Sequence, residues 1–415
     1  MEVRPSPNTS RRGSSVEPAE LAAFGRVSAS AWLLGAVAVV VLVLVLAWVG
    51  LASLHLLPRA SAIEQRSQVL LAMPPTQAVG KRDAFSSVWL LEFAIPEGER
   101  DRVVAAARGG TGRFATDGYR FDDLSGIANG DLCIPEDADC LAKVRARPNA
   151  ARAAIAAHPV ALANVTALAG FDHYRRQTVV AGSDPLPPLA VPAWLQTTDA
   201  ALRFVDGDHA EGLRRACTAA DTWARLATRA DHFGVQAVAA DQFLADARLV
   251  AAMLDELPVT VTIPDACQTA FELPPDPSAV VCDAAKAMYR EQGTRLRGFL
   301  QGPASNPAAA PPPNWQTRLL FNPDAAIALS SPLFASYCSK DAGITTAAAR
   351  IEQASSPLDV GLGQAVFNSM GTNLVRITNP RRWRTPEAVV ARLQAVLATA
   401  SILRVRIERH PVALH

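Results

Sequence analysis

Residues 31–57 read AWLLGAVAVVVLVLVLAWVGLASLHLL, and no charged residue lies between Arg26 and Arg59. A helix needs about 20 apolar residues to cross the hydrocarbon core of a bilayer. Trp32 and Trp48 stand near the two ends of the stretch, where indole rings favour the lipid–water boundary. The stretch therefore predicts a transmembrane helix over residues 29–57, followed by a domain at 58–415.

The length of this apolar stretch favours an uncleaved signal anchor. A cleavable signal peptide has a shorter apolar core of roughly 7–15 residues. The sequence Ala60-Ser61-Ala62 nevertheless offers an A-x-A pattern just beyond the stretch. Cleavage after Ala62 is therefore kept as the alternative, and a buried helix of a soluble protein is the least favoured interpretation.

The charges that flank the helix predict its orientation. Four arginines precede it, whereas Arg59 and Arg66 are the nearest cations after it. The positive-inside rule then puts residues 1–28, a segment rich in Pro, Ser and Arg, in the cytoplasm as a disordered tail. All six cysteines follow the helix, and an even number on one side suits an oxidising compartment. We therefore expect a single-pass protein of a bacterial inner membrane whose C-terminal domain lies in the periplasm.

The basic residues give no indication of nucleic-acid binding. The net charge is +1, and thirty-six of the forty cationic residues are arginine. A nucleic-acid-binding protein would show a clear basic excess or stripe. The arginine and alanine content is typical of a GC-rich bacterial genome, so a single arginine is weak evidence for a binding site.

The region 193–257 carries the most regular helical pattern. Helices are predicted at 194–205, 209–229 and 231–257, with a turn at Gly207-Asp208, and the second carries an apolar stripe. This stripe consists of Leu213, Ala216, Cys217, Ala220, Trp223, Ala224 and Ala227. The hairpin resembles a tetratricopeptide helix–turn–helix, but only one copy is visible, and an ordinary αα-hairpin is the favoured alternative.

The remaining patterns also favour helix, so the predicted fold class is mainly α. Further helices are expected at 62–72, 97–108, 279–300 and 386–400, whereas 86–95 and 402–407 suit either strand or helix, and the glycine-rich segment 361–371 predicts a turn. Proline-rich segments at 181–192 and 301–314 are candidate boundaries. The domain at 58–415 is therefore either single or divided at one of them.

The cysteines predict a partial disulfide framework. Cys133 and Cys140 bracket a short loop, and Cys267 and Cys282 bracket the turn-forming sequence LPPDP, so both pairs are predicted to be joined. Cys217 and Cys338 are then left over, either joined to each other or unpaired, since Cys217 lies on an apolar helix face where a free thiol behaves as a small hydrophobe.

No motif in the sequence names a reaction. The patterns HExxH, CxxC and GxSxG and a Walker lysine are all absent, so no metal or cofactor site is predicted. The acids between residues 131 and 139 do not have the spacing of an EF-hand, and solvated acids beside a disulfide are favoured over a calcium site. The weak candidates for a polar site are Asp172, His173, His209 and His232.

Several segments resemble those of a protein group. They are DCLAKVRARP at 139–148, FDHYR at 171–175, the hairpin around Gly207, and FNSMGTNL at 367–374. In these segments the chain is similar to signal-anchored, alanine-rich helical proteins of Gram-negative bacteria that lack an assigned function. The resemblance implies no catalytic residue.

Two functional hypotheses follow. The favoured one is a membrane-anchored periplasmic scaffold or binding protein whose partner is another periplasmic protein or an envelope polymer. The alternative is a periplasmic hydrolase whose site is assembled from distant residues such as Asp172, His173, His209 and His232, because catalytic groups need to be neighbours only in space. The two hypotheses differ in whether these residues meet in one pocket.

Overall fold

The computed structural model describes residues 29–53, 60–75, 82–106, 114, 116–125, 127, 129–175, 187–272, 276–301, 320–354, 357–360, 364, 368–377 and 386–411. The chain divides into two compact units, Met1–Leu56 and Leu57–His415. The described residues are mainly helical and include no β-strand, only three isolated bridges, which confirms the predicted fold class. The expected tail at 1–28 lies outside the described residues, as do most of the candidate boundaries at 181–192 and 301–314.

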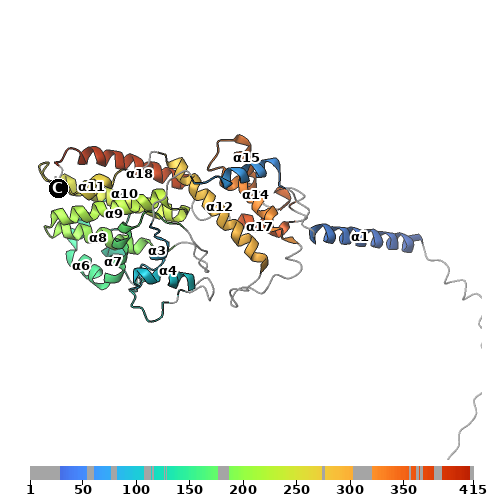
Figure 1. Ribbon diagram of the computed structural model, residues 1–415, viewed down its shortest axis with the longest axis horizontal. Helices are drawn as coiled ribbons and strands as arrows, with labels where there is room; N and C mark the ends of the chain where they lie inside the picture. Colours follow the sequence, from blue (N-terminus) through green and yellow to red (C-terminus); the bar gives the residue numbers. More distant parts are fainter. Residues whose placement is uncertain are drawn as a thin grey trace, which may run out of the picture. The chain divides into compact units, whose positions relative to one another are not determined.

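The first unit contains the long helix α1, Ala29–Ser53 (Figure 1). Its segment Ala31–Gly50 has a mean hydropathy of 2.9 and none of its residues is buried. Large apolar side chains such as Trp32 and Leu44 are therefore exposed along most of this segment. An apolar helix of this length without protein cover has the properties of a membrane span.

The second unit, here called the helical body, is built from helices joined by short connections. The helices of its first half are α2 (Ala62–Ala72), α3 (Phe85–Trp89), α4 (Glu97–Ala106), α5 (Cys140–Ala146), α6 (Pro148–Ala157), α7 (Pro159–Ala167) and α8 (Ala190–Val205). Those of its second half are α9 (His209–Arg229), α10 (Phe233–Glu256), α11 (Asp265–Thr269), α12 (Pro277–Gln301), α14 (Pro323–Ala335), α15 (Ala342–Gln353), α17 (Ser369–Ile377) and α18 (Pro386–Ile407).

Helices α8, α9 and α10 form the centre of the helical body. Every residue of the predicted apolar stripe on α9 is buried. The turn between α8 and α9 uses Gly207 with φ +95°, a conformation that favours glycine. Gly212 then lets the two helices approach closely, because a Cβ added there would lie 2.7 Å from the Phe204 nitrogen. The hairpin is confirmed, and its tetratricopeptide character stays a prediction.

Helix α18 packs along α10 (Figure 1). Its buried side chains recur at helical spacing and include Val389, Leu393, Val396, Ala400 and Leu403. At opposite ends of the contact, Arg392 pairs with Asp241 at 2.7 Å and Arg406 pairs with Asp255. Residues 402–407, for which strand or helix was open, continue this helix.

Two helices in the described part of the chain are long and apolar enough to cross a membrane. They are Ala31–Gly50 within α1 and Ala388–Ile407 within α18, and the latter is 28% buried. The pair Pro148–Ala157 and Pro159–Gly170 would add a third span if counted together, but the two are bent by 82°. Only the segment in α1 is wholly without protein cover.

Three disulfides cross-link the helical body and correct part of the predicted framework. Cys133 is joined to Cys140, as predicted. The predicted Cys267–Cys282 bond is wrong, because Cys267 is joined to Cys217 and Cys282 to Cys338. Helix α11 packs on α9, and α12 packs on α14, so each of these cysteines faces a helix that is distant in sequence. Cys217 is therefore neither unpaired nor joined to Cys338.

Two further segments differ from or refine the predictions. Residues 86–95, which suited strand or helix, contain the short helix α3. The turn predicted at residues 361–371 is wrong at its C-terminal end, because α17 begins at Ser369. Asn368 precedes this helix and is fully buried, and its Oδ1 accepts a hydrogen bond from the Asn322 amide at 2.9 Å. Val375 lies in the core and Met370 and Leu374 pack against it, so α17 also carries an apolar face.

Candidate functional site

The segment FDHYR at residues 171–175 links two distant parts of the helical body. On one side, the His173 carbonyl accepts a hydrogen bond from the Ala84 amide at 2.8 Å. On the other, the Tyr174 carbonyl accepts one from the Asp231 amide at 3.1 Å. Isolated bridges between Asp83 and His173 and between Tyr174 and Ala230 follow the same path. The backbone of this segment thus brings the pair Asp172-His173 close to the pair Asp231-His232.

The His173 side chain is buried and does not have the setting of a general base. Its exposed fraction is 6%, and within the described residues its Nδ1 has no hydrogen-bond partner. Burial lowers the pKa of the imidazole, and Asp83 only partly opposes this effect. A carboxylate oxygen of Asp172 accepts a hydrogen bond from the Arg82 amide at 2.9 Å. Asp172 therefore helps hold the segment in place beside a neutral histidine.

The other two histidines have structural roles at separate places. His232 caps α10, because its Nδ1 accepts a hydrogen bond from the Gly234 amide at 3.2 Å. His209 begins α9 and packs against Phe204, with ring centroids 4.6 Å apart. Helix α9 has 21 residues, so at about 1.5 Å per residue roughly 30 Å separates His209 from His232. The four candidate residues therefore do not meet in one pocket.

A small pocket opens next to the FDHYR segment, between the end of α9 and helix α12. It has a volume of about 70 Å³, and its polar lining includes Thr228, Asp231, Asp283, Arg175, Arg229 and Arg290. None of Asp172, His173 and His232 lines it. The pocket therefore has the character of an arginine-rich binding site, and lacks the paired acid and imidazole expected of a hydrolase.

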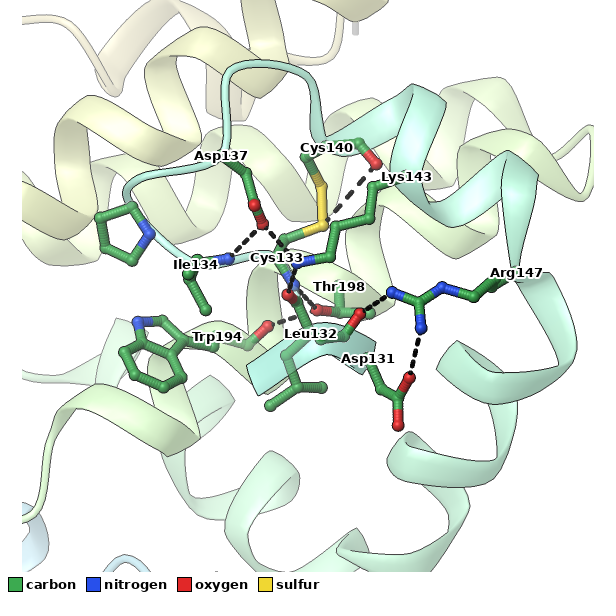
Figure 2. Close-up of polar contacts among 12 residues, drawn as sticks. Asp131, Leu132, Cys133, Ile134, Asp137, Cys140, Lys143, Arg147, Trp194 and Thr198 are labelled. Carbon is green, nitrogen blue, oxygen red and sulfur yellow. Dashed lines mark hydrogen bonds and ion pairs between the residues drawn. A yellow bond between two sulfur atoms is a disulfide. The ribbon is translucent and has the colours of Figure 1, made fainter. Parts of the chain in front are cut away.

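The acidic loop closed by Cys133 and Cys140 uses its carboxylates internally (Figure 2). Asp137 accepts hydrogen bonds from the Ile134 amide at 2.8 Å and from Lys143 Nζ at 2.7 Å. Asp139 caps α5 by accepting from the Ala142 amide at 2.9 Å. Across the described residues, no cluster of three or more potential protein ligands for a metal is found.

The backbone of the same loop is anchored to the core of the body. The Cys133 amide donates to Thr198 Oγ1 on α8 at 2.8 Å, and Lys143 Nζ donates to the Leu132 carbonyl at 2.6 Å (Figure 2). Asp131 forms an ion pair with Arg147 at 3.2 Å. These contacts account for Asp131, Asp137 and Asp139 as structural parts of the loop, whereas Glu136 is exposed.

One buried polar cluster was missed by the sequence reasoning. Asp246 on α10 is fully buried, and its Oδ1 lies 2.6 Å from Thr197 Oγ1 and 3.3 Å from Gln242 Nε2. Its Oδ2 has no hydrogen-bond partner in the described part of the chain. Burial raises the pKa of Asp246 to about 7. A usable signal was present, because Asp246 lies one helical turn from the apolar residues Phe243 and Val250.

Comparison of the chain with protein-family models, with curated proteins and with solved structures gives no match. The functional argument therefore depends on the geometry of the helical body and on the properties of α1.

Proposed function

We propose that this protein is a single-pass inner-membrane protein whose disulfide-linked helical body lies in the periplasm and binds a partner there. The observation that carries the proposal is α1, an apolar helix without buried residues that precedes a separate compact unit. A helix with this surface is stable in a bilayer and not in water. The three disulfides support an oxidising compartment for the helical body.

The contacts at the start of α2 favour an uncleaved signal anchor over a signal peptide that is cleaved after Ala62. Ser61 and Glu64 form a capping box, with the Ser61 amide 2.5 Å from Glu64 Oε2 and the Glu64 amide 3.3 Å from Ser61 Oγ. In addition, Ser331 Oγ on α14 donates to the Glu64 carbonyl at 3.1 Å. Cleavage after Ala62 would remove the capping residue of a helix that packs in the body.

The packing of α18 supports a single span. Its buried side chains already contact the body, and its arginines Arg392 and Arg406 pair with carboxylates on α10. Removing this helix into lipid would break both ion pairs and uncover the apolar face of α10. We therefore assign the membrane span to α1 alone.

A binding role is favoured over the hydrolase because of the positions of the histidines. His209 is roughly one length of α9 away from His232, and the His173 side chain is buried. The partner classes that suit an anchored periplasmic body are another periplasmic protein and an envelope polymer.

The test is a pair of reporter fusions to the full chain. A reporter enzyme that is active only after export is fused after His415 in one strain and before Met1 in a second. We expect activity from the first fusion only, with the full-length protein in the membrane fraction after an alkaline wash. Activity from the fusion at the N-terminus alone, or a soluble product shortened at Ala62, would refute the proposed topology.

A further inference from the structure

The pocket beside the FDHYR segment is lined by three arginines, Arg175, Arg229 and Arg290. Arg175 is half-buried, whereas Arg229 at the end of α9 and Arg290 on α12 are exposed. Among the described residues no carboxylate forms an ion pair with any of these guanidinium groups. By contrast, Arg214 and Arg392 pair with carboxylates at 2.6 and 2.7 Å. Within the described residues, the pocket therefore gathers cationic groups without a carboxylate ion pair, whereas many other arginines of the protein are paired.

The carboxylates around the pocket have other partners. Asp283 lies 3.6 Å from Lys286 Nζ. Asp221, which is close enough to Arg229 to be affected by its charge, is bound by Arg225. Asp231 makes a polar interaction of its own. Within the described residues, none of these carboxylates forms an ion pair with the three guanidinium groups.

The charge balance of the pocket favours an anion. The charged residues that line the pocket are three arginines and two aspartates, Asp231 and Asp283, which gives a net excess of one positive charge. Guanidinium groups bind phosphate and carboxylate oxygens through paired hydrogen bonds. A phosphate monoester presents three acceptor oxygens, enough to bind all three guanidinium groups, whereas a carboxylate presents only two.

We propose that this pocket binds the phosphate group of a phosphomonoester. A volume of about 70 Å³ accommodates a few water molecules or one phosphate group, so the rest of the ligand lies outside the pocket. The three guanidinium groups come from separate segments, which suits a tetrahedral anion bound from several directions better than a planar carboxylate bound by one fork.

This inference rests on the proposed binding function, because it names the chemical group that the helical body recognises. It does not depend on the orientation of α1, since the purified protein presents the pocket on either topology. A failure of the reporter fusions would therefore leave it standing, and a failure of phosphate binding would leave the membrane topology standing.

The test is isothermal titration of the full chain in a non-ionic detergent. The probes are inorganic phosphate, glycerol 3-phosphate and acetate. The variant R229Q/R290Q removes two of the guanidinium groups. The control R120Q/R409Q removes the same charge at two exposed arginines outside the pocket. Far-UV circular dichroism and the thermal unfolding temperature check that both variants fold.

We expect saturable binding of glycerol 3-phosphate in the millimolar range or tighter. The affinity should fall about tenfold or more in R229Q/R290Q, because each lost charged hydrogen bond is worth roughly 1.5–3 kcal/mol, and should change little in the control. Tighter binding of glycerol 3-phosphate than of inorganic phosphate would show that the ligand is a phosphate ester and not free phosphate. Preference for inorganic phosphate, tighter binding of acetate, absence of saturable binding, or an equal loss in the control would each overturn the proposal.

Discussion

The substitution Asp246→Asn should change the stability of the protein in a pH-dependent way. The gain in stability over wild type should be larger at alkaline pH than at acidic pH. Asp246 is fully buried between α8 and α10, and burial raises the pKa of its carboxyl from 3.8 to about 7. Thr197 and Gln242 donate hydrogen bonds that partly oppose this rise. The folded protein therefore keeps a proton that the unfolded chain releases at acidic pH.

The sign of the effect follows from proton linkage. The folded pKa lies above the unfolded value, so the unfolded state binds fewer protons between about pH 4 and 7, and stability falls as the pH rises through this range. Each pKa unit is worth about 1.4 kcal/mol, so a rise from 3.8 to about 7 costs roughly 4 kcal/mol above pH 7. Asparagine does not ionise and should avoid this cost.

The assay is urea unfolding of the full chain in a non-ionic detergent, followed by far-UV circular dichroism at pH 5 and pH 8. The gain of Asp246→Asn over wild type should be larger at pH 8 than at pH 5 by about 2.5 kcal/mol. The control Asp117→Asn changes an exposed carboxyl and should show nearly the same difference from wild type at both values. A pH-independent effect of Asp246→Asn would refute the reasoning.

Two further predictions test the packing and the cross-links. Gly212→Ala should destabilise the body by about 1–3 kcal/mol, because the new Cβ would lie within 3 Å of Phe204 atoms. The control is Gly298→Ala, where the new Cβ would have nothing within 4 Å, and it should be neutral or stabilising by up to about 1 kcal/mol. If both variants lost the same free energy of unfolding in urea, the close approach of α8 and α9 at Gly212 would not be the cause. Non-reducing peptide mapping should join Cys217 to Cys267, and breaking this bond should cost roughly 4 kcal/mol for a loop of 50 residues. A peptide that joins Cys267 to any other cysteine would contradict the structure.

Local patterns predicted most of the helices, because an amphipathic helix repeats its apolar residues along a continuous stretch. The stripe on α9 from Leu213 to Ala227 is an example, and all its residues are buried. Helix α17 was missed although its apolar residues Met370, Leu374 and Val375 recur at helical spacing and lie in or against the core. Asn368 and Thr372 are also fully buried, one turn apart, and the glycines of the segment favoured its interpretation as a turn.

The disulfides and the arginine pocket depend on contacts between distant segments. Cys267 was predicted to join Cys282 because both flank a turn, but α11 packs on α9 instead. Arg175, Arg229 and Arg290 come from three separate segments, and nothing in the local sequence distinguishes them in an arginine-rich chain. Of the FDHYR segment, only Arg175 lines the pocket, and the candidates Asp172 and His173 do not.

The order of the disulfides along the chain has a consequence for biogenesis. The six cysteines are joined in consecutive pairs, Cys133 to Cys140, Cys217 to Cys267 and Cys282 to Cys338. The three covalent loops therefore neither overlap nor enclose one another. A polypeptide delivered across a membrane from its N-terminal side exposes both members of each pair before the first member of the next. An oxidase that joins cysteines as they emerge would produce the native connectivity directly, and the protein should mature in a strain that lacks disulfide isomerase.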